Sequence, residues 1–150
     1  MAAASAAQAI FRPVVVLVLW TFVVLMAMAR KRIGAVFRRR LTARDFELGE
    51  SARVPADVAL ANRNFMNLLE VPVLFYVACL VAYVSRHVNG STVTLAWIYV
   101  GLRLAHSLVH LSYNNVTHRV LVFAASNCVL VALWIRLALP LFLPLSAAAR

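Results

Sequence analysis

Charged residues are scarce in this chain, and acidic residues are the scarcest. Charged residues make up 13% of its 150 residues, and only five of them are Asp or Glu. A soluble domain carries about 25% charged and about 45–50% apolar residues, whereas this chain is 64% hydrophobic, with a mean hydropathy of +0.86. A soluble fold of this length could not bury so much apolar surface, so most of the chain must lie in lipid. The composition excludes a disordered chain, a cytosolic enzyme with a membrane tail and a small secreted disulfide scaffold.

Cysteine is almost absent, which removes further possibilities. Cys79 and Cys128 both lie inside apolar runs and lack the spacing of metal ligands or of a disulfide framework. We expect both to be small buried hydrophobic side chains. The sequence also contains no alternating strand pattern, no internal repeat and no second, soluble domain.

Four long apolar runs dominate the chain instead. They cover about residues 10–29, 65–84, 92–113 and 120–143. Each is close to the roughly 20 residues that a helix needs to cross the hydrocarbon core of a bilayer. The sequence therefore predicts one all-α integral membrane domain over residues 1–150, built as a bundle of four transmembrane helices.

The first run has an alternative interpretation as a signal peptide. It ends in Ala27-Met28-Ala29, a small-residue pattern similar to a cleavage site. However, the run is slightly long for a signal peptide, and Arg30-Lys31-Arg32 follows it directly. These features favour a retained first span.

Basic residues indicate how the bundle is oriented. By the positive-inside rule, the loop over residues 30–64 is cytoplasmic and the N-terminus is outside. This loop is expected to carry a short amphipathic helix, and its cluster Arg38-Arg39-Arg40 is expected to lie against anionic headgroups. The net charge of +10 then needs no nucleic-acid partner. Nine of the fifteen basic residues lie in this loop: Arg30, Lys31, Arg32, Arg38, Arg39, Arg40, Arg44, Arg53 and Arg63.

Polar residues inside the apolar runs need a reason, because lipid makes ionisable groups costly. Arg63, Asn67 and Glu70 are spaced by four and three, so they share one face of the second helix. Two similar stripes follow, with Tyr99, Arg103, His106 and His110 on the third helix and Arg119, Phe123 and Asn127 on the fourth.

The second and third helices also bring two opposite charges to similar depths. A lone buried charge is very costly, so we predict that Glu70 and Arg103 form an ion pair. Pro72 removes a backbone donor and is predicted to kink the second helix.

All three stripes converge on the cytoplasmic half of the predicted bundle. This arrangement predicts a cationic, hydrogen-bonding pocket that opens beside lipid and suits an anionic, peptide-like ligand meeting an apolar one. The alternative is that the stripes serve only as contacts between helices. His106 and His110 also have the spacing of two zinc ligands on a helix, but the sequence offers no third ligand near them, so we predict no metal.

These residues resemble the motifs of a known family. The stretch Arg63-x3-Asn67-x2-Glu70 is similar to the second-helix motif of the MAPEG family, the membrane-associated proteins of eicosanoid and glutathione metabolism. Arg103-x2-His106-x3-His110, followed by Arg119, resembles the branch of microsomal prostaglandin E synthase and microsomal glutathione transferase. The resemblance covers the chain from Arg30 to about Trp134.

The resemblance implies a homotrimer of four-helix subunits with glutathione as co-substrate, bound between neighbouring subunits near the cytoplasmic face. By position, Arg119 would be the catalytic residue beside the thiol. A lipophilic electrophile or peroxide would approach from the bilayer. The residues implied to bind glutathione or the substrate are Arg30, Arg63, Asn67, Glu70, Arg103, His106 and His110.

The chain departs from that branch at three hydroxyl positions. His110 and Phe123 stand where the branch has tyrosines, and Val120 stands where it has a serine, which leaves Arg119 as the one obvious stabiliser of a thiolate. We therefore predict a glutathione-dependent transferase or peroxidase. The alternatives are a non-catalytic member that binds lipid or a partner protein, and a purely structural membrane protein. The short loops, without eukaryotic retrieval signals, predict a multi-pass protein of a bacterial inner membrane.

Overall fold

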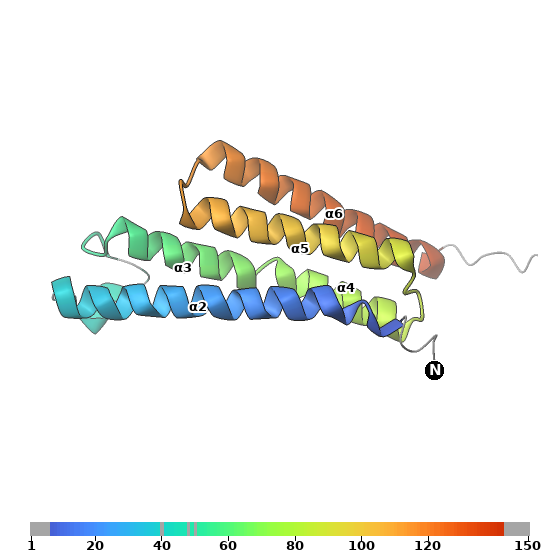
Figure 1. The fold of residues 1–150 in the computed structure, drawn as a ribbon, viewed down its shortest axis with the longest axis horizontal. Helices are drawn as coiled ribbons and strands as arrows, with labels where there is room; N and C mark the ends of the chain where they lie inside the picture. Colours follow the sequence, from blue (N-terminus) through green and yellow to red (C-terminus); the bar gives the residue numbers. More distant parts are fainter. Residues whose placement is uncertain (1–6, 40, 48, 50, 143–150) are drawn as a thin grey trace, which may run out of the picture.

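Four helical columns lie side by side along one axis in the computed structural model (Figure 1), which describes residues 7–142 except 40, 48 and 50. The columns are α2 (Phe11–Arg39), α3 (Ala56–Leu69) continued by α4 (Pro72–Val84), α5 (Gly90–Leu111) and α6 (Val116–Phe142). All four columns contain a segment long and apolar enough to cross a membrane, as the sequence predicted. Within the described chain the fold is all-helical.

Two helices are longer than the apolar runs that predicted them. Helix α2 continues past Ala29 to Arg39, and α3 already begins at Ala56, so much of the expected loop over residues 30–64 is helical. Arginine, lysine and alanine are good helix formers, which allows the helix to extend where hydropathy has fallen. A short 3-10 helix, η1 (Ala43–Phe46), lies in the remaining connection. A small apolar cluster joins this connection to the two helices, formed by Ala35, Leu41, Phe46, Val54 and Val58.

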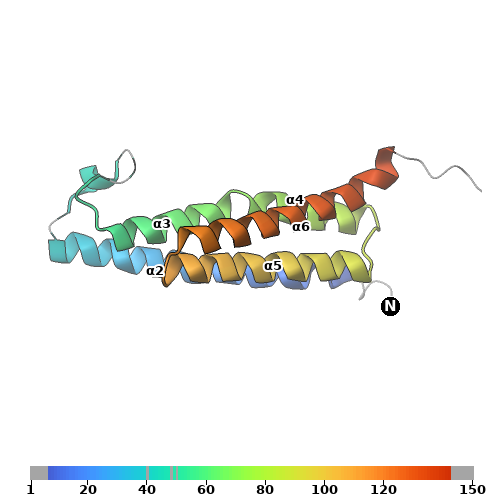
Figure 2. The same ribbon diagram turned by 90° about the horizontal axis from the view of Figure 1, so that it is seen from above.

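The extended helices give the bundle two different ends. The C-terminal part of α2, the start of α3 and their connection project beyond the turn between α5 and α6 (Figure 2). We call this part, together with that turn, the basic end, because most of the basic residues lie there. The described chain starts and finishes at the opposite end (Figure 1).

The second column is broken, as Pro72 predicted. Helix α3 ends at Leu69, and Pro72 is the first residue of α4. A proline ring clashes with the carbonyl four residues earlier and offers no N–H group, so a helix cannot run straight through it. The break lies at Glu70 and Val71, in the middle of the second span.

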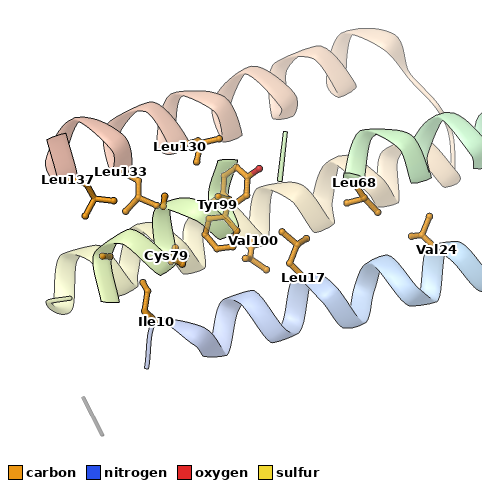
Figure 3. Packing of buried hydrophobic residues seen from close by; sticks show 14 residues of the cluster. Ile10, Leu17, Val24, Leu68, Cys79, Tyr99, Val100, Leu130, Leu133 and Leu137 are labelled. Carbon is orange, nitrogen blue, oxygen red and sulfur yellow. The ribbon is translucent and has the colours of Figure 1, made fainter. Parts of the chain in front are cut away.

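The core surrounds α5, which contacts every other helix. Phe75 stacks on Tyr99 with ring centroids 4.6 Å apart. Figure 3 shows how side chains from all four columns meet around Tyr99. The labelled members of this cluster are Ile10, Leu17, Val24, Leu68, Cys79, Tyr99, Val100, Leu130, Leu133 and Leu137.

The two cysteines differ from the expectation that both are buried. Cys79 is buried in the core, but Cys128 is exposed, so the prediction is wrong for Cys128. The buried face of α6 carries Ser126 and Leu130. Cys128 lies two residues from each, which turns it to the opposite side of the helix.

Candidate functional site

A cavity of about 200 Å³ lies between α3, α5 and α6 near the basic end. Asn67 comes from α3, His106 from α5 and Arg119 from the first turn of α6, so at least one predicted residue of each stripe reaches it. The remaining wall is apolar. It consists of Val116, Val120 and Phe123.

Arg119 is held by the turn that precedes its helix. Its Nη1 donates a hydrogen bond to Oδ1 of Asn114 at 2.8 Å. Asn114 has a φ of +48°, a left-handed conformation that asparagine tolerates better than most residues. The Nε of Arg119 is buried and has no hydrogen-bond partner in the protomer. The guanidinium is therefore fixed in place, and its positive charge lies at the wall of the cavity.

The buried face of α5 stands behind the cavity. His106 packs against Phe123 with ring centroids 5.6 Å apart and lies edge-on to His110 at 6.0 Å. Nδ1 of His106 and both ring nitrogens of His110 are buried without a hydrogen-bond partner. Among the described residues, no three His, Cys, Asp or Glu side chains gather into a possible metal site. His106 thus lines the cavity and, among the described residues, has one ring nitrogen without a hydrogen-bond partner.

Arg103 is fully buried, with 0% of its surface exposed, yet it does not form the predicted ion pair with Glu70. Instead, its Nη2 donates a hydrogen bond to the main-chain carbonyl of Asn67, and its guanidinium lies 5.5 Å from the ring centroid of Phe123. The prediction is wrong for the protomer, because the break after Leu69 turns Glu70 to the surface. The same break explains why Arg103 donates to the Asn67 carbonyl instead.

A continuous helix would use the Asn67 carbonyl to accept the N–H of Val71, four residues later. Among the described main-chain hydrogen bonds, this one is missing at the break. An unpaired carbonyl buried in an apolar environment is costly, and Arg103 supplies the donor that the backbone cannot. Arg103 therefore joins α5 to the broken end of α3, directly beside the cavity.

Sequence analysis missed one buried polar pair. Nδ2 of Asn64 donates a hydrogen bond to Oγ of Ser107 at 2.7 Å, and both side chains are fully buried. The sequence could have revealed that Asn64 is buried, because its spacing from Ala61 and Leu68 places it on the same helix face as these apolar residues. This contact fixes α3 against α5 two turns from the helix break.

Other predicted site residues lie outside the cavity. Arg63 and Glu70 are exposed on the outward face of the second column. Arg30 is exposed on α2 and lines a different crevice, between α2 and α3. His110 and Arg103 are buried near the cavity but are not among the residues that line it.

An apolar groove of about 550 Å³ runs between α4 and α6. Val71 and Asn127 lie at its near end, one helical turn beyond the cavity residues Asn67 and Phe123. The groove thus continues the line of the cavity from the middle of the bundle toward the end opposite the basic end. Its other lining residues are Leu74, Leu130, Val131, Trp134, Ile135 and Ala138.

Four apolar columns with a polar cavity near one end define a multi-pass integral membrane protein with a candidate ligand site. The sequence model of the MAPEG family matches residues 10–139, and the chain belongs to that family. The family includes glutathione transferases and peroxidases and eicosanoid synthases. No curated protein and no solved structure matches the chain significantly.

Proposed function

We propose that the protein is a glutathione-dependent membrane transferase or peroxidase that acts on lipophilic electrophiles. The observation that carries this proposal is the cavity in which Arg119, His106 and Asn67 meet beside an apolar groove. The positive charge of Arg119 and the polar side chains of His106 and Asn67 at the cavity wall suit an anionic, peptide-like ligand.

Arg119 is the proposed catalytic residue. Its guanidinium would stabilise the thiolate of glutathione, as a cation near a thiol lowers the thiol pKa. Asn67 and His106 would hold polar groups of the tripeptide, while the apolar walls exclude water and strengthen these interactions. The thiol proton passes to solvent. The sulfur then forms a bond to the electrophilic carbon, and the leaving group departs with the electron pair of the broken bond.

The apolar groove between α4 and α6 supports a lipophilic second substrate. Its lining is almost entirely apolar, and its residues Val71 and Asn127 lie one helical turn from the cavity residues Asn67 and Phe123. A hydrophobic molecule lying there would present its reactive end to the thiolate.

The outward charges of the second column support assembly into a homotrimer. Arg63 and Glu70 are exposed on a helix that crosses the membrane, where contact with lipid would be costly. A neighbouring subunit would cover them, so that they could bind glutathione between subunits together with Arg30. Arg103 and His110 would support the cavity from behind rather than contact the ligand.

The alternative is a non-catalytic member that binds lipid or a partner protein. A specific observation favours it, because Val120 and Phe123 both line the cavity. These are two of the positions at which the resembled branch has hydroxyl groups. Without them, the cavity has fewer donors for activating a thiol.

A glutathione titration of the detergent-purified protein distinguishes these functions. We expect bound glutathione to show a lowered thiol pKa, measured by the ultraviolet absorbance of the thiolate as pH rises. One pKa unit corresponds to about 1.4 kcal/mol of preferential stabilisation of the thiolate. Arg119→Leu should remove the shift and most conjugation of a hydrophobic electrophile, while glutathione still binds.

Arg136→Leu is the matched control. It removes the same charge from the same helix, but Arg136 is exposed at the opposite end, 3.5 Å from Oγ of Ser91. This variant should keep the pKa shift. Binding of glutathione with an unshifted pKa and no turnover would establish the non-catalytic alternative. No binding at all would mean that the polar stripes serve assembly.

A further inference from the structure

The turn between α5 and α6 carries a side-chain contact that the proposed mechanism does not use. The hydroxyl of Tyr113 lies 3.0 Å from Nδ1 of His118, within hydrogen-bond distance, and the two rings meet edge-on with centroids 5.7 Å apart. Tyr113 directly precedes Asn114 in the chain, and His118 directly precedes Arg119. The contact therefore runs beside the hydrogen bond that holds the proposed catalytic arginine, across the same turn (Figure 2).

This contact lies at the surface of the protein, which makes it a poor contributor to stability. Tyr113 is 61% exposed, and His118 is exposed as well. A hydrogen bond that competes with water in this way adds little to the free energy of unfolding. What it does provide is a local restraint, because it ties two side chains on opposite sides of one turn.

The main chain of the turn is fixed to the two helices separately. The N–H of Asn114 donates to the carbonyl of Val109 at 2.9 Å, which anchors this residue to α5 in its left-handed conformation. Oδ1 of Asn115 accepts the main-chain N–H of His118 at 3.0 Å, and the Asn115 carbonyl accepts that of Arg119 at 3.0 Å, which starts α6. Each half of the turn is therefore fixed to its own helix, and the two side-chain pairs fix the halves to each other.

The first turns of α6 also form one wall of the cavity. Val116, Arg119 and Val120 line it, and His118 lies among them in the sequence. A shift of this backbone moves the guanidinium of Arg119 relative to His106 on α5. The Coulomb attraction between two charges falls by about a fifth when their separation grows from about 4 to 5 Å. A displacement of this size is enough to weaken the stabilisation of a bound thiolate measurably.

We propose that Tyr113 and His118 form a clamp that positions Arg119. The clamp holds the α5–α6 turn closed, so that Asn114 keeps the guanidinium at the cavity wall. Neither residue of the clamp is among those that line the cavity, so both are positioning residues that act through Arg119. The catalytic consequence of the clamp rests on the proposed function, whereas the clamp itself can be measured without glutathione.

Chemical modification of Arg119 tests the clamp directly. Phenylglyoxal reacts with guanidinium groups, and peptide mass spectrometry measures the rate at each arginine of the purified full-length protein. Tyr113→Phe removes the hydroxyl and keeps the ring. It should accelerate modification of Arg119 about threefold, as expected when an opening equilibrium loses one weak hydrogen bond. Arg136, exposed at the opposite end of the bundle, is an internal reference whose rate should not change.

Two substitutions of His118 separate the hydrogen bond from the ring. His118→Leu should match Tyr113→Phe, and the double variant should show about the same acceleration as either single one, because all three lose the same contact. His118→Asn should keep the wild-type rate, since its side-chain oxygen can replace Nδ1 as the acceptor. Ser112→Ala is the matched control. It also removes a hydroxyl from this turn, but the Ser112 hydroxyl donates to the Leu108 carbonyl of α5 at 2.6 Å and does not reach α6.

The catalytic consequence is measured on the same variants with glutathione. Tyr113→Phe should reduce the thiol pKa shift of bound glutathione by about half a unit, the change expected for a displacement of about 1 Å at an effective dielectric constant of about 20. The kcat for conjugation should fall while the KM for glutathione changes little, because the charge of Arg119 acts on the thiolate. His118→Asn should retain both the pKa shift and kcat.

The outcomes separate failure of the clamp from failure of the proposed function. Unchanged modification of Arg119 in Tyr113→Phe and His118→Leu would overturn the clamp, even if glutathione is turned over. The same acceleration in Ser112→Ala would overturn it too, since any loosening of the turn would then suffice. An unchanged thiol pKa shift in Tyr113→Phe, despite faster modification, would mean that the contact does not position the charge. Faster modification in the clamp variants alone, with no thiol pKa shift in the wild type, would leave the clamp standing and overturn the glutathione chemistry.

Discussion

Arg103 illustrates how a fully buried charge is accommodated in this bundle without a carboxylate partner. Its one hydrogen-bond partner is the Asn67 carbonyl, which the helix break has released from the backbone ladder. The charge is also spread over the face of Phe123, an interaction worth about 0.5–2 kcal/mol. Since Asn67 and Phe123 both line the Arg119 cavity, this residue fixes two of its walls.

The link between Arg103 and the helix break can be tested by a double-mutant cycle. Arg103→Leu should destabilise the protein by about 1–3 kcal/mol, because the Asn67 carbonyl loses its donor. In a Pro72→Ala background the same change should cost much less, since a continuous helix lets Val71 donate to that carbonyl. Denaturant unfolding in detergent, followed by circular dichroism, measures both steps.

Glu70→Gln is the control for this cycle. Glu70 and Arg103 form no ion pair among the described residues, so their substitutions should be coupled much more weakly than those of Pro72 and Arg103. A strong coupling between Glu70 and Arg103, together with none between Pro72 and Arg103, would restore the ion pair that the sequence predicted. That result would mean that Glu70 pairs with Arg103 only when the protein is assembled.

At the scale of single residues, helical periodicity predicted which side chains share a face. The sequence did not reveal which groups those side chains contact. The spacing of Arg103, His106 and His110 placed them on one face of α5, and all three are buried there. Their partners could not be predicted, because a main-chain carbonyl released at a helix break leaves no mark in the sequence pattern. Asn64 was missed because it interrupts an apolar face that otherwise attracts no attention.

At the scale of elements, hydropathy marks where lipid begins but not where a helix ends. Helix α2 continues to Arg39 because the connection after it folds back and packs on it. The connection is organised by the carboxylate of Asp45, which accepts hydrogen bonds from the Thr42 N–H at 2.8 Å and the Ser51 hydroxyl at 2.9 Å. Nη1 of Arg53 lies 3.6 Å from the same carboxylate.

This carboxylate makes the order of the connection depend on pH. The hydrogen bond from the backbone N–H of Thr42 is the largest cause that lowers the pKa of Asp45 below its ordinary value, followed by the hydrogen bond from the Ser51 hydroxyl. Because the folded pKa is the lower one, the stabilisation is complete above the ordinary aspartate pKa and is lost as pH falls through the folded value. Hydrogen exchange of residues 41–47 and 51–55 should therefore stay slow near neutral pH and accelerate in acid.

Asp45→Asn should remove this pH dependence and loosen the connection at neutral pH. Limited trypsin digestion then provides the measurement, because Arg44 and Arg53 flank the structured segment and should be cut faster. Asp57→Asn is the control, since Asp57 is largely exposed where it pairs with Lys31 and such pairs contribute little. Equal protease sensitivity in both variants would mean that Asp45 does not organise the connection.

At the scale of the whole molecule, the number and order of the spans could be predicted, because each apolar run has to cross the bilayer as a helix. The distribution of the site residues could not. Asn67 faces the cavity of its own protomer, whereas Arg63 and Glu70 on the same column face outward. Spacing by three and four assigns residues to one broad face, but the packing of neighbouring helices decides which part of that face is covered.

The orientation of the whole bundle decides which compartment supplies the Arg119 cavity. Nine basic residues lie between Arg30 and Arg63, so the positive-inside rule predicts that the basic end is cytoplasmic. In a variant with both native cysteines replaced by alanine, His87→Cys should react with a membrane-impermeant maleimide on intact cells. Arg44→Cys should react only after permeabilisation. Both side chains are exposed at opposite ends of the bundle, so each reports one side without disturbing the core. The reverse labelling pattern would turn the basic end outward, and the Arg119 cavity would then open away from the cytoplasmic glutathione that the proposed reaction requires.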